Sequence, residues 1–217
     1  QPVLLNENLQ KLRNLEDKGY KSATLKAHFI ADGKPGRLLE ALNKLCQDAE
    51  DAIAGGKNIL IISDRDSDVK SAPIPSLLAV GAVHHHLVNQ KLRTKAGIVV
   101  EAGDIRETHH FATVIGYGAS AINPYLALET LLSLNENDML SKKLPQKKLF
   151  ENYKEAIGKG LLKVLSKMGI STLQSYQSAQ IFEAIGLGPE VIERCFKGTV
   201  SRISGVSFDE LADEVLV

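Results

Sequence analysis

The sequence lacks an excess of charge of either sign, and it lacks long apolar runs. Its 217 residues include 26 basic and 26 acidic side chains, which leaves no electrostatic footprint for nucleic acid or for an anionic membrane. No window approaches the roughly 20 apolar residues that a membrane span requires. The first residues also lack the basic and apolar regions of a signal peptide. We therefore expect neither a nucleic-acid partner nor a membrane partner.

Cysteines and catalytic signatures are equally scarce. Cys46 and Cys195 are far apart and lie in helical patterns, so we interpret them as buried small hydrophobic residues rather than as a disulfide. The pair Gly116 and Gly118 follows an expected helix and lacks the third glycine of a dinucleotide fingerprint. Ser76 lacks the flanking glycines of a nucleophile elbow. We predict no catalytic residue in this chain.

The histidines do not have the spacing of a metal site. Residues 84–86 are three consecutive histidines on an expected helix, and residues 109–110 form a second pair. Consecutive helical residues project about 100° apart, so the side chains of one cluster cannot converge on one ion. We predict no metal ligands and assign these histidines structural roles.

What the sequence does contain, from residue 6 to residue 134, is an alternation of short apolar runs with helical patterns. The expected strands cover residues 22–30, 59–62, 98–101 and 121–123. The expected helices cover residues 6–14, 38–53, 75–89, 106–115 and 125–134. Strands that alternate with helices form a parallel sheet with right-handed crossovers. We predict an α/β fold, either an open parallel sheet or a partial or degenerate (β/α) barrel.

The pattern breaks between residues 135 and 148, where polar and charged residues show no periodicity. We predict a first unit over residues 1–134, a linker over 135–149 and a second, mainly helical unit over 150–217. In the second unit we expect helices over 151–168, 179–185 and 189–196 and a strand over 170–173. A capping box from Ser207 to Glu210 opens the last helix.

Polar side chains follow three of the expected strands, and we call Ser63, Asp64, Arg65, Glu101 and Asn123 the strand-end rim. Ligands of open α/β sheets bind at this edge, although ion pairing among the rim residues and loop amides is an equally good reading. The positive charge of Arg65 would lower the pKa of Asp64 if the two approach. Glu101 has no orienting partner in its own strand. We predict that the rim serves assembly and not bond-making chemistry.

Several longer stretches resemble the large subunit of glutamate synthase. The resemblance is carried by residues 72–87 (APIPSLLAVGAVHHHL), 109–111 (HHF), 116–118 (GYG) and 123–126 (NPYL) of its central domain. Residues 166–173 (SKMGISTL) and 179–183 (AQIFE) resemble the entry to its FMN-binding barrel. Residues 108–111 and 198–211 favour the ferredoxin-dependent type. The missing initiator Met fits a piece of a longer protein.

The resemblance implies a fragment of an enzyme that makes two glutamates from glutamine, 2-oxoglutarate and a reductant. The central domain would be a non-catalytic scaffold between an amidotransferase domain and the FMN domain, and it could line the ammonia path. The intact enzyme would carry FMN and a three-iron cluster, accept electrons from ferredoxin and reside in the cytoplasm or the plastid stroma. The fragment alone is expected to be inactive and to bind no cofactor tightly.

The resemblance also implies that residues 150–217 begin a TIM-barrel domain, with residues 171–180 as its first strand and the following loop. Ser175, Tyr176 and Gln180 would then be positions that face FMN. Ser178 stands where the family typically has glycine, so its backbone either avoids a glycine-only conformation or adopts one at a cost.

Two other functions compete with this interpretation. One is a stand-alone, non-catalytic interaction module with a degenerate barrel fold. The other is a small hydrolase or isomerase that uses Asp64, Arg65 and Glu101 of the strand-end rim. Measured turnover of a substrate would favour the hydrolase or isomerase over the interaction module. A reading frame that extends far beyond both ends of this sequence would favour the synthase fragment over both.

Overall fold

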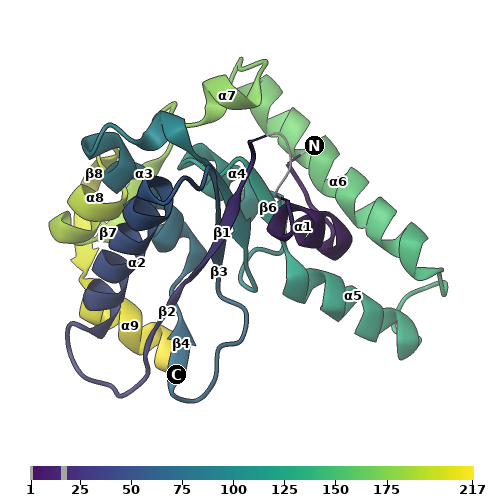
Figure 1. The fold of residues 1–217 in the computed structure, drawn as a ribbon. Helices are drawn as coiled ribbons and strands as arrows, with labels where there is room; N and C mark the ends of the chain where they lie inside the picture. Colours follow the sequence, from purple (N-terminus) through teal and green to yellow (C-terminus); the bar gives the residue numbers. More distant parts are fainter. Residues whose placement is uncertain (1, 16–18) are drawn as a thin grey trace.

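A four-stranded parallel sheet forms the centre of the computed structural model, which describes residues 2–15 and 19–217 (Figure 1). The strands are β1 (Ser22–Lys26), β3 (Ile59–Ser63), β5 (Gly97–Glu101) and β6 (Ala121–Asn123), in the order β1-β3-β5-β6. All three pairings are parallel. The predicted α/β fold with a parallel sheet is thus confirmed.

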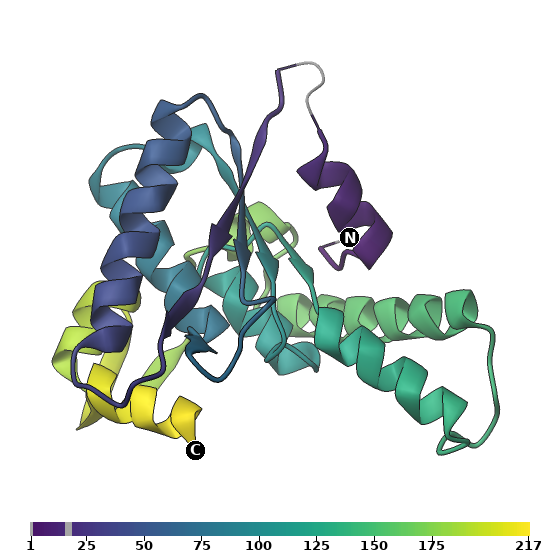
Figure 2. The same ribbon diagram turned by 60° about the horizontal axis from the view of Figure 1, so that its bottom comes forward.

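Helices cover the two faces of the sheet unequally. The first face packs against α2 (Arg37–Ala54), α3 (Ser76–Asn89) and α4 (Thr108–Gly116), and it buries alternate strand residues such as Leu60, Ile62 and Val100. The second face carries Ile61 and Val99, which pack against Leu9 of α1 (Asn6–Arg13). Figure 2 shows α1 on the side of the sheet opposite α2. Burial on both faces explains why these strands are continuously apolar.

The expected first strand is two strands, because the chain changes partners at Ala27. Up to this residue the chain pairs with β3, and the Ala27 amide donates to the Ser63 carbonyl over 2.8 Å. The Ala27 carbonyl then accepts from the Ile74 amide over 2.9 Å. Beyond it, β2 (His28–Ile30) pairs antiparallel with β4 (Ser71–Pro73). A single strand over residues 22–30 was therefore wrong.

The segment before α1 extends the sheet beyond β6, which the sequence did not indicate. The Ile122 amide donates to the Pro2 carbonyl over 2.7 Å, and the Leu4 amide donates to the Ile122 carbonyl over 2.8 Å. Val3 and Ile122 form a parallel bridge. Residues 2–4 therefore occupy the edge of the sheet next to β6.

Two long helices follow the sheet, α5 (Tyr125–Glu136) and α6 (Gln146–Lys167), and they form a hairpin that projects from the body of the molecule (Figure 1). The loop between them is held by Asn135, whose side chain donates to the Leu144 carbonyl over 3.0 Å and accepts from its amide over 2.9 Å. Residues Ile157, Leu161 and Leu165 of α6 join the main core. The domain division at 135–149 stays a prediction.

Residues 170–187 differ from the expected strand and helix, and both expectations were wrong. The structure has a short helix α7 (Leu173–Tyr176), a loop and strand β7 (Glu183–Leu187). Thr172 starts α7 because its hydroxyl accepts from the Ser175 amide over 3.2 Å. The left-handed φ angles of Ser178 and Gln180, 61° and 53°, interrupt any helix there.

The last elements form a small second sheet. Strand β7 pairs in parallel with β8 (Val200–Val206), and α8 (Pro189–Cys195) connects them. The expected helix over 189–196 is confirmed, and α9 (Phe208–Leu216) opens with the predicted capping box from Ser207 to Glu210. Among residues 2–15 and 19–217, no helix combines the length and apolar character needed to cross a membrane.

Candidate functional site at the carboxyl edge of the sheet

The carboxyl ends of β3, β5 and β6 bring three residues of the strand-end rim side by side. Ser63 is paired in register with Glu101, and Glu101 with Asn123. The three residues are nearly inaccessible, with exposed fractions of 5%, 2% and 0%. The sequence therefore located a buried polar row at the edge where α/β proteins bind ligands.

Glu101 is the centre of this row. Its carboxylate accepts from the Ser63 hydroxyl, from Arg65 Nε at 3.0 Å and from the guanidinium of Arg13. Arg13 comes from the end of α1, so the orienting groups reach Glu101 from a neighbouring strand and from the opposite helix. A buried carboxylate needs such partners because burial without them is costly. The sequence contained no signal for the contribution of Arg13.

Arg65 links the rim to α5. Its guanidinium lies 4.1 Å from the centre of the Tyr125 ring and pairs with Glu129 at 3.3 Å. Cations over aromatic faces are attracted by the ring quadrupole. Arg65 therefore fixes the start of α5 against the end of β3.

Asp64 does not pair with Arg65, whose partners are Glu101 and Glu129. Its carboxylate accepts from the Gly103 amide at 2.8 and 3.1 Å. Burial raises the pKa of Asp64 from 3.8 to about 6, with a further rise from the nearby Asp104. The condition for a lowered pKa is not met, because Arg65 turns toward Glu101 instead. Burial raises the pKa of Tyr125 as well.

A cavity of about 430 Å³ adjoins Asp64 at this edge. Its polar lining includes Gly103, Asp104, Arg106 and Tyr125. Asp104 accepts from the Ser76 amide over 2.9 Å at the start of α3. The cavity is large enough for a small polar molecule, and its walls carry two carboxylates, one guanidinium and one phenol.

The contacts of the Asn123 side chain hold the N-terminal segment in place. Its amide nitrogen donates to the Leu4 carbonyl at 3.0 Å and to the Asn6 side chain at 2.9 Å. It therefore ties the edge segment and the start of α1 to the end of β6.

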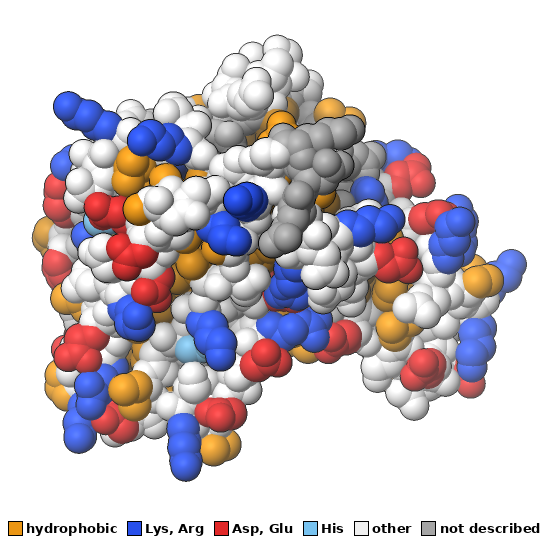
Figure 3. All heavy atoms as spheres, in the orientation of Figure 1, with side chains coloured by type: hydrophobic (Ala, Val, Ile, Leu, Met, Phe, Trp, Pro, Cys, Tyr) orange, Lys and Arg blue, Asp and Glu red, His pale blue; other side chains and the backbone are white. Residues whose placement is uncertain are grey.

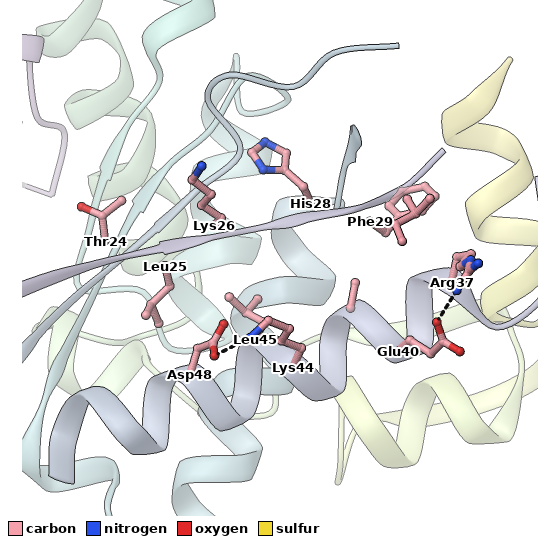
Figure 4. A pocket seen from close by; sticks show the side chains of 12 residues that line it. Thr24, Leu25, Lys26, His28, Phe29, Arg37, Glu40, Lys44, Leu45 and Asp48 are labelled. Carbon is pink, nitrogen blue, oxygen red and sulfur yellow. Dashed lines mark hydrogen bonds and ion pairs between the residues drawn. The ribbon is translucent and has the colours of Figure 1, made fainter. Parts of the chain in front are cut away.

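A second cavity, of about 520 Å³, lies beside the outer edge of β1 (Figure 4). Leu25, Phe29 and Leu45 contribute apolar lining. The charged side chains around it pair with one another, Arg37 with Glu40 at 2.9 Å and Lys44 with Asp48 at 2.9 Å. Charges of both signs are interspersed over the face seen in Figure 3 as well. This cavity lacks the converging polar groups of the rim.

The three residues expected to face FMN lie at the other end of the sheet. Ser175 is exposed in α7, and Gln180 is exposed in the following loop. Tyr176 is fully buried next to Phe182, at 6.5 Å between ring centres. The Gln177 side chain donates to the Ala119 carbonyl over 2.7 Å, just before β6 begins. In Figure 1, α7 accordingly lies beyond the amino ends of the strands. A first barrel strand over residues 171–180 was therefore wrong.

Both cysteines are buried, as predicted, and burial raises the pKa of Cys46 to about 11 and that of Cys195 to about 12. Within the described ranges, residues 2–15 and 19–217, no group of three or more His, Cys, Asp or Glu residues could hold a metal ion.

Comparison with known proteins gives consistent matches along the chain. A family model described as the glutamate synthase central domain matches residues 1–188. The "Glutamate synthase [NADH]" of Schizosaccharomyces pombe is 42% identical over 213 residues, which is 97% of this chain and 10% of that protein. The "Ferredoxin-dependent glutamate synthase" of Pyropia yezoensis is 50% identical over 198 residues, 87% of this chain and 13% of that protein. The "Glutamate synthase [NADPH] large chain" of Bacillus subtilis is 43% identical over 213 residues, 98% of this chain and 14% of that protein.

Solved structures are similar in fold alone. An L230A mutant of flavocytochrome b2 with benzoylformate has a TM-score of 0.52 at 11% identity, over 94% of this chain and 46% of that chain. An A198G:L230A mutant with pyruvate bound has a TM-score of 0.50 at 14% identity, over 96% of this chain and 55% of that chain. This similarity agrees with the reading of the sheet as part of a (β/α) barrel.

Proposed function

Because this chain belongs to the glutamate synthase family, whose central domain it matches, we propose that it works as a scaffold inside a multidomain glutamate synthase. That enzyme would form two glutamates from glutamine, 2-oxoglutarate and a reductant. The chain spans 10–14% of the length of the relatives described above. Its partners would be an amidotransferase domain and an FMN-binding domain of the same polypeptide.

The observation that carries the scaffold role is the saturation of Glu101. Its carboxylate is held by Ser63, Arg65 and Arg13. A general base needs a free lone pair directed at a substrate, whereas this carboxylate is committed to ion pairs and a hydroxyl. These contacts join α1, β3 and β5 into one unit, and Arg65 adds α5.

The cavity next to Asp64 supports a second part of the proposal, that this edge lines the path of ammonia between the two active sites. Asp64, Asp104 and Tyr125 present polar groups to a space of about 430 Å³ at the end of the strands. Polar walls of this kind suit a small hydrogen-bonding molecule.

FMN and a three-iron cluster would carry the electrons in the intact enzyme. Ser175 and Gln180 fit a contact with FMN because their side chains are exposed, whereas Tyr176 is buried and its hydroxyl has no partner in the described part of the chain. The two cysteines are buried on α2 and α8, and two thiols are fewer than a cluster needs, so its ligands would lie elsewhere in the enzyme. When bound, FMN would supply the reducing electrons.

We favour ferredoxin as the electron donor and the cytoplasm or the plastid stroma as the compartment. The support is the 50% identity to the ferredoxin-dependent enzyme of Pyropia yezoensis, against 42% and 43% for the NADH and NADPH enzymes. Steady-state assays of the intact enzyme with reduced ferredoxin, NADH and NADPH would decide between the donors.

The scaffold proposal is tested by Asp64→Asn and Glu101→Gln in the synthase that contains this chain. Glutamine hydrolysis should be unchanged, since neither residue belongs to that active site. Glutamate formed per glutamine hydrolysed should fall, because ammonia would escape from a disturbed path. Both half-reactions are measured in each variant. A thousandfold loss of the flavin half-reaction with free ammonia supplied, in a folded variant, would show direct catalytic participation and contradict the proposal.

A further inference from the structure

The hydrogen-bond partners of His84 on α3 determine which of its two ring nitrogens carries the proton. Its exposed fraction is 8%. Its Nδ1 lies 2.9 Å from Arg93 Nε, and its Nε2 lies 2.9 Å from the Ser178 hydroxyl. A guanidinium has no acceptor, so Nδ1 accepts and the proton resides on Nε2. That N–H then donates to Ser178, which leaves the ring neutral with both nitrogens satisfied.

Arg93 is itself held in place at the amino ends of the strands. Its Nη1 donates to the Ala96 carbonyl over 2.7 Å and its Nη2 to the Gly118 carbonyl over 2.8 Å. Gly118 has a φ of +120°, and a Cβ atom there would lie 2.4 Å from His84 Nδ1. Only glycine leaves room for the ring at this position.

The segment 177–182 is fastened to the same turn. The Ser178 amide donates to the Gly116 carbonyl over 2.8 Å. A Cβ atom on Gly116 would lie 2.5 Å from the Phe182 ring, so this glycine permits close packing. Ser178 has a φ of 61°, which costs energy for a residue with a side chain. Its hydroxyl bond to His84 compensates in a way that glycine could not.

We propose that Arg93, His84 and Ser178 form an uncharged-histidine joint that fixes segment 173–182 to the central sheet and thereby positions Ser175 and Gln180. The three side chains come from separate parts of the chain, and each bond in the series is needed to orient the next. His84 and Ser178 are positioning residues in this scheme. The part that concerns FMN rests on the proposed function, because Ser175 and Gln180 are its predicted contacts.

The joint itself is tested on this 217-residue chain without any cofactor. In ¹⁵N-histidine NMR spectra, His84 should show the neutral form with its proton on Nε2, and Arg93→Lys should disturb that signal. A ring protonated on Nδ1, or on both nitrogens at neutral pH, would overturn the joint.

A double-mutant cycle gives a second reading. Ser178→Ala should raise the unfolding equilibrium constant about tenfold, and His84→Ala should raise it further because it also removes the bond from Arg93. The double variant should match His84→Ala alone, because the bond between His84 and Ser178 is already lost there. The control cycle combines His86→Ala with Ser178→Ala. Their effects on the unfolding equilibrium constant should multiply, because His86 bonds to Glu50 and not to Ser178. A double variant whose unfolding equilibrium constant is about tenfold above that of His84→Ala contradicts the joint.

Positioning is tested in the intact synthase by the dissociation constant of FMN and the visible circular dichroism of the flavin. His84→Ala and Ser178→Ala should weaken FMN binding about tenfold and change the spectrum, whereas His86→Ala should not. His84→Gln should restore both, because its amide can accept from Arg93 and donate to Ser178. Unchanged FMN binding in the Ala variants would overturn the positioning role. A wild-type synthase without FMN would contradict the proposed function instead, and the NMR result would still decide on the joint.

Discussion

Asp64 and His84 respond to burial in opposite directions. The pKa of Asp64 is raised from 3.8 to about 6, so folding favours its neutral, protonated form. The pKa of His84 is lowered from 6.5 to about 4, so folding favours its neutral, unprotonated form. The same desolvation therefore makes a carboxyl group hold its proton and an imidazole release one.

These two residues should give opposite contributions to the pH dependence of stability. The contribution of Asp64 is present below pH 3.8 and is lost as the pH rises through 6. That of His84 is present above pH 6.5 and is lost as the pH falls through 4. Between pH 4 and 6 the slopes should largely cancel, each being at most about 1.4 kcal/mol per pH unit.

Urea unfolding at several pH values separates the contribution of Asp64 to stability from that of His84. Relative to the wild type, Asp64→Asn should gain stability as the pH rises, and His84→Gln should lose it. The titratable and charged neighbours stay in place in both variants, Asp104 and His28 near Asp64, Arg93 and His85 near His84. If the unfolding free energies of the wild type and of both variants change in parallel with pH, neither group has a shifted pKa.

Gly118 offers a test of close packing at a single position. Gly118→Ala places a methyl group where the His84 ring lies, in addition to straining a φ of +120°. Gly33→Ala is the matched control, since its φ is +68° and no atom lies within 4 Å of the added carbon. We expect the control to cost about 1 kcal/mol of unfolding free energy and Gly118→Ala to cost roughly 2 kcal/mol more. Equal costs in urea unfolding would show that the His84 contact is unimportant.

Among the helices and strands, the sequence predicted correctly those elements that interactions between nearby residues determine. Strands β3 and β5 are buried on both faces, and continuous apolar runs marked them. The capping box of α9 involves residues three apart, and it was found as well. By contrast, residues 179–185 have a helical composition, yet residues 183–185 pair with β8 through contacts that no local pattern contains.

For the strand-end rim, too, the sequence predicted the positions of residues but not their distant partners. The positions of Ser63, Glu101 and Asn123 follow from where three strands end, so the sequence located them. Their partners do not follow from it, since Arg13 is 88 residues away from Glu101. The direction of Arg65, toward Glu101 and away from its neighbour Asp64, depends on the placement of that carboxylate across the sheet.

The loop between α5 and α6 should be the first site of trypsin cleavage. Lys142 and Lys143 are exposed in this loop, whereas Lys147 and Lys148 lie in the first turn of α6. Cleavage needs several residues of unfolded backbone, so we expect the first cuts after Lys142 or Lys143. Mass spectrometry of a short digestion identifies them.

Both fragments should then stay associated in gel filtration, because the inward face of α6 is buried in the main core. Asn135→Ala should accelerate the cut by freeing the loop. Early cleavage elsewhere, with this loop protected, would argue against the boundary between residues 135 and 149.

At the scale of the whole molecule, the isolated chain should bind no FMN tightly. Its parallel sheet has four strands and does not close into a barrel, and barrel enzymes build their sites from loops of many strands. The flavin absorbance of the purified chain after mixing with FMN and desalting measures this directly. A yellow preparation with stoichiometric flavin would refute the expectation.

The two candidate regions of the molecule lie at opposite ends of one sheet. The strand-end rim occupies the carboxyl end, and the His84 joint occupies the amino end. The strands between them are buried on both faces, so the sheet is a rigid spacer. Any coupling between the proposed ammonia path and the proposed FMN contacts would therefore pass through β3, β5 and β6 or through domains that contact both ends.

The pairing of residues 2–4 with Ile122 has a consequence for the time course of synthesis. A ribosome adds about 5–20 residues per second, so the edge segment waits roughly 6–24 seconds for its partner strand to be made. During that interval Val3 and Leu4 lack the strand that they pair with. Residues 2–4 are thus made well before the strand that they pair with, and they complete the edge of the sheet late.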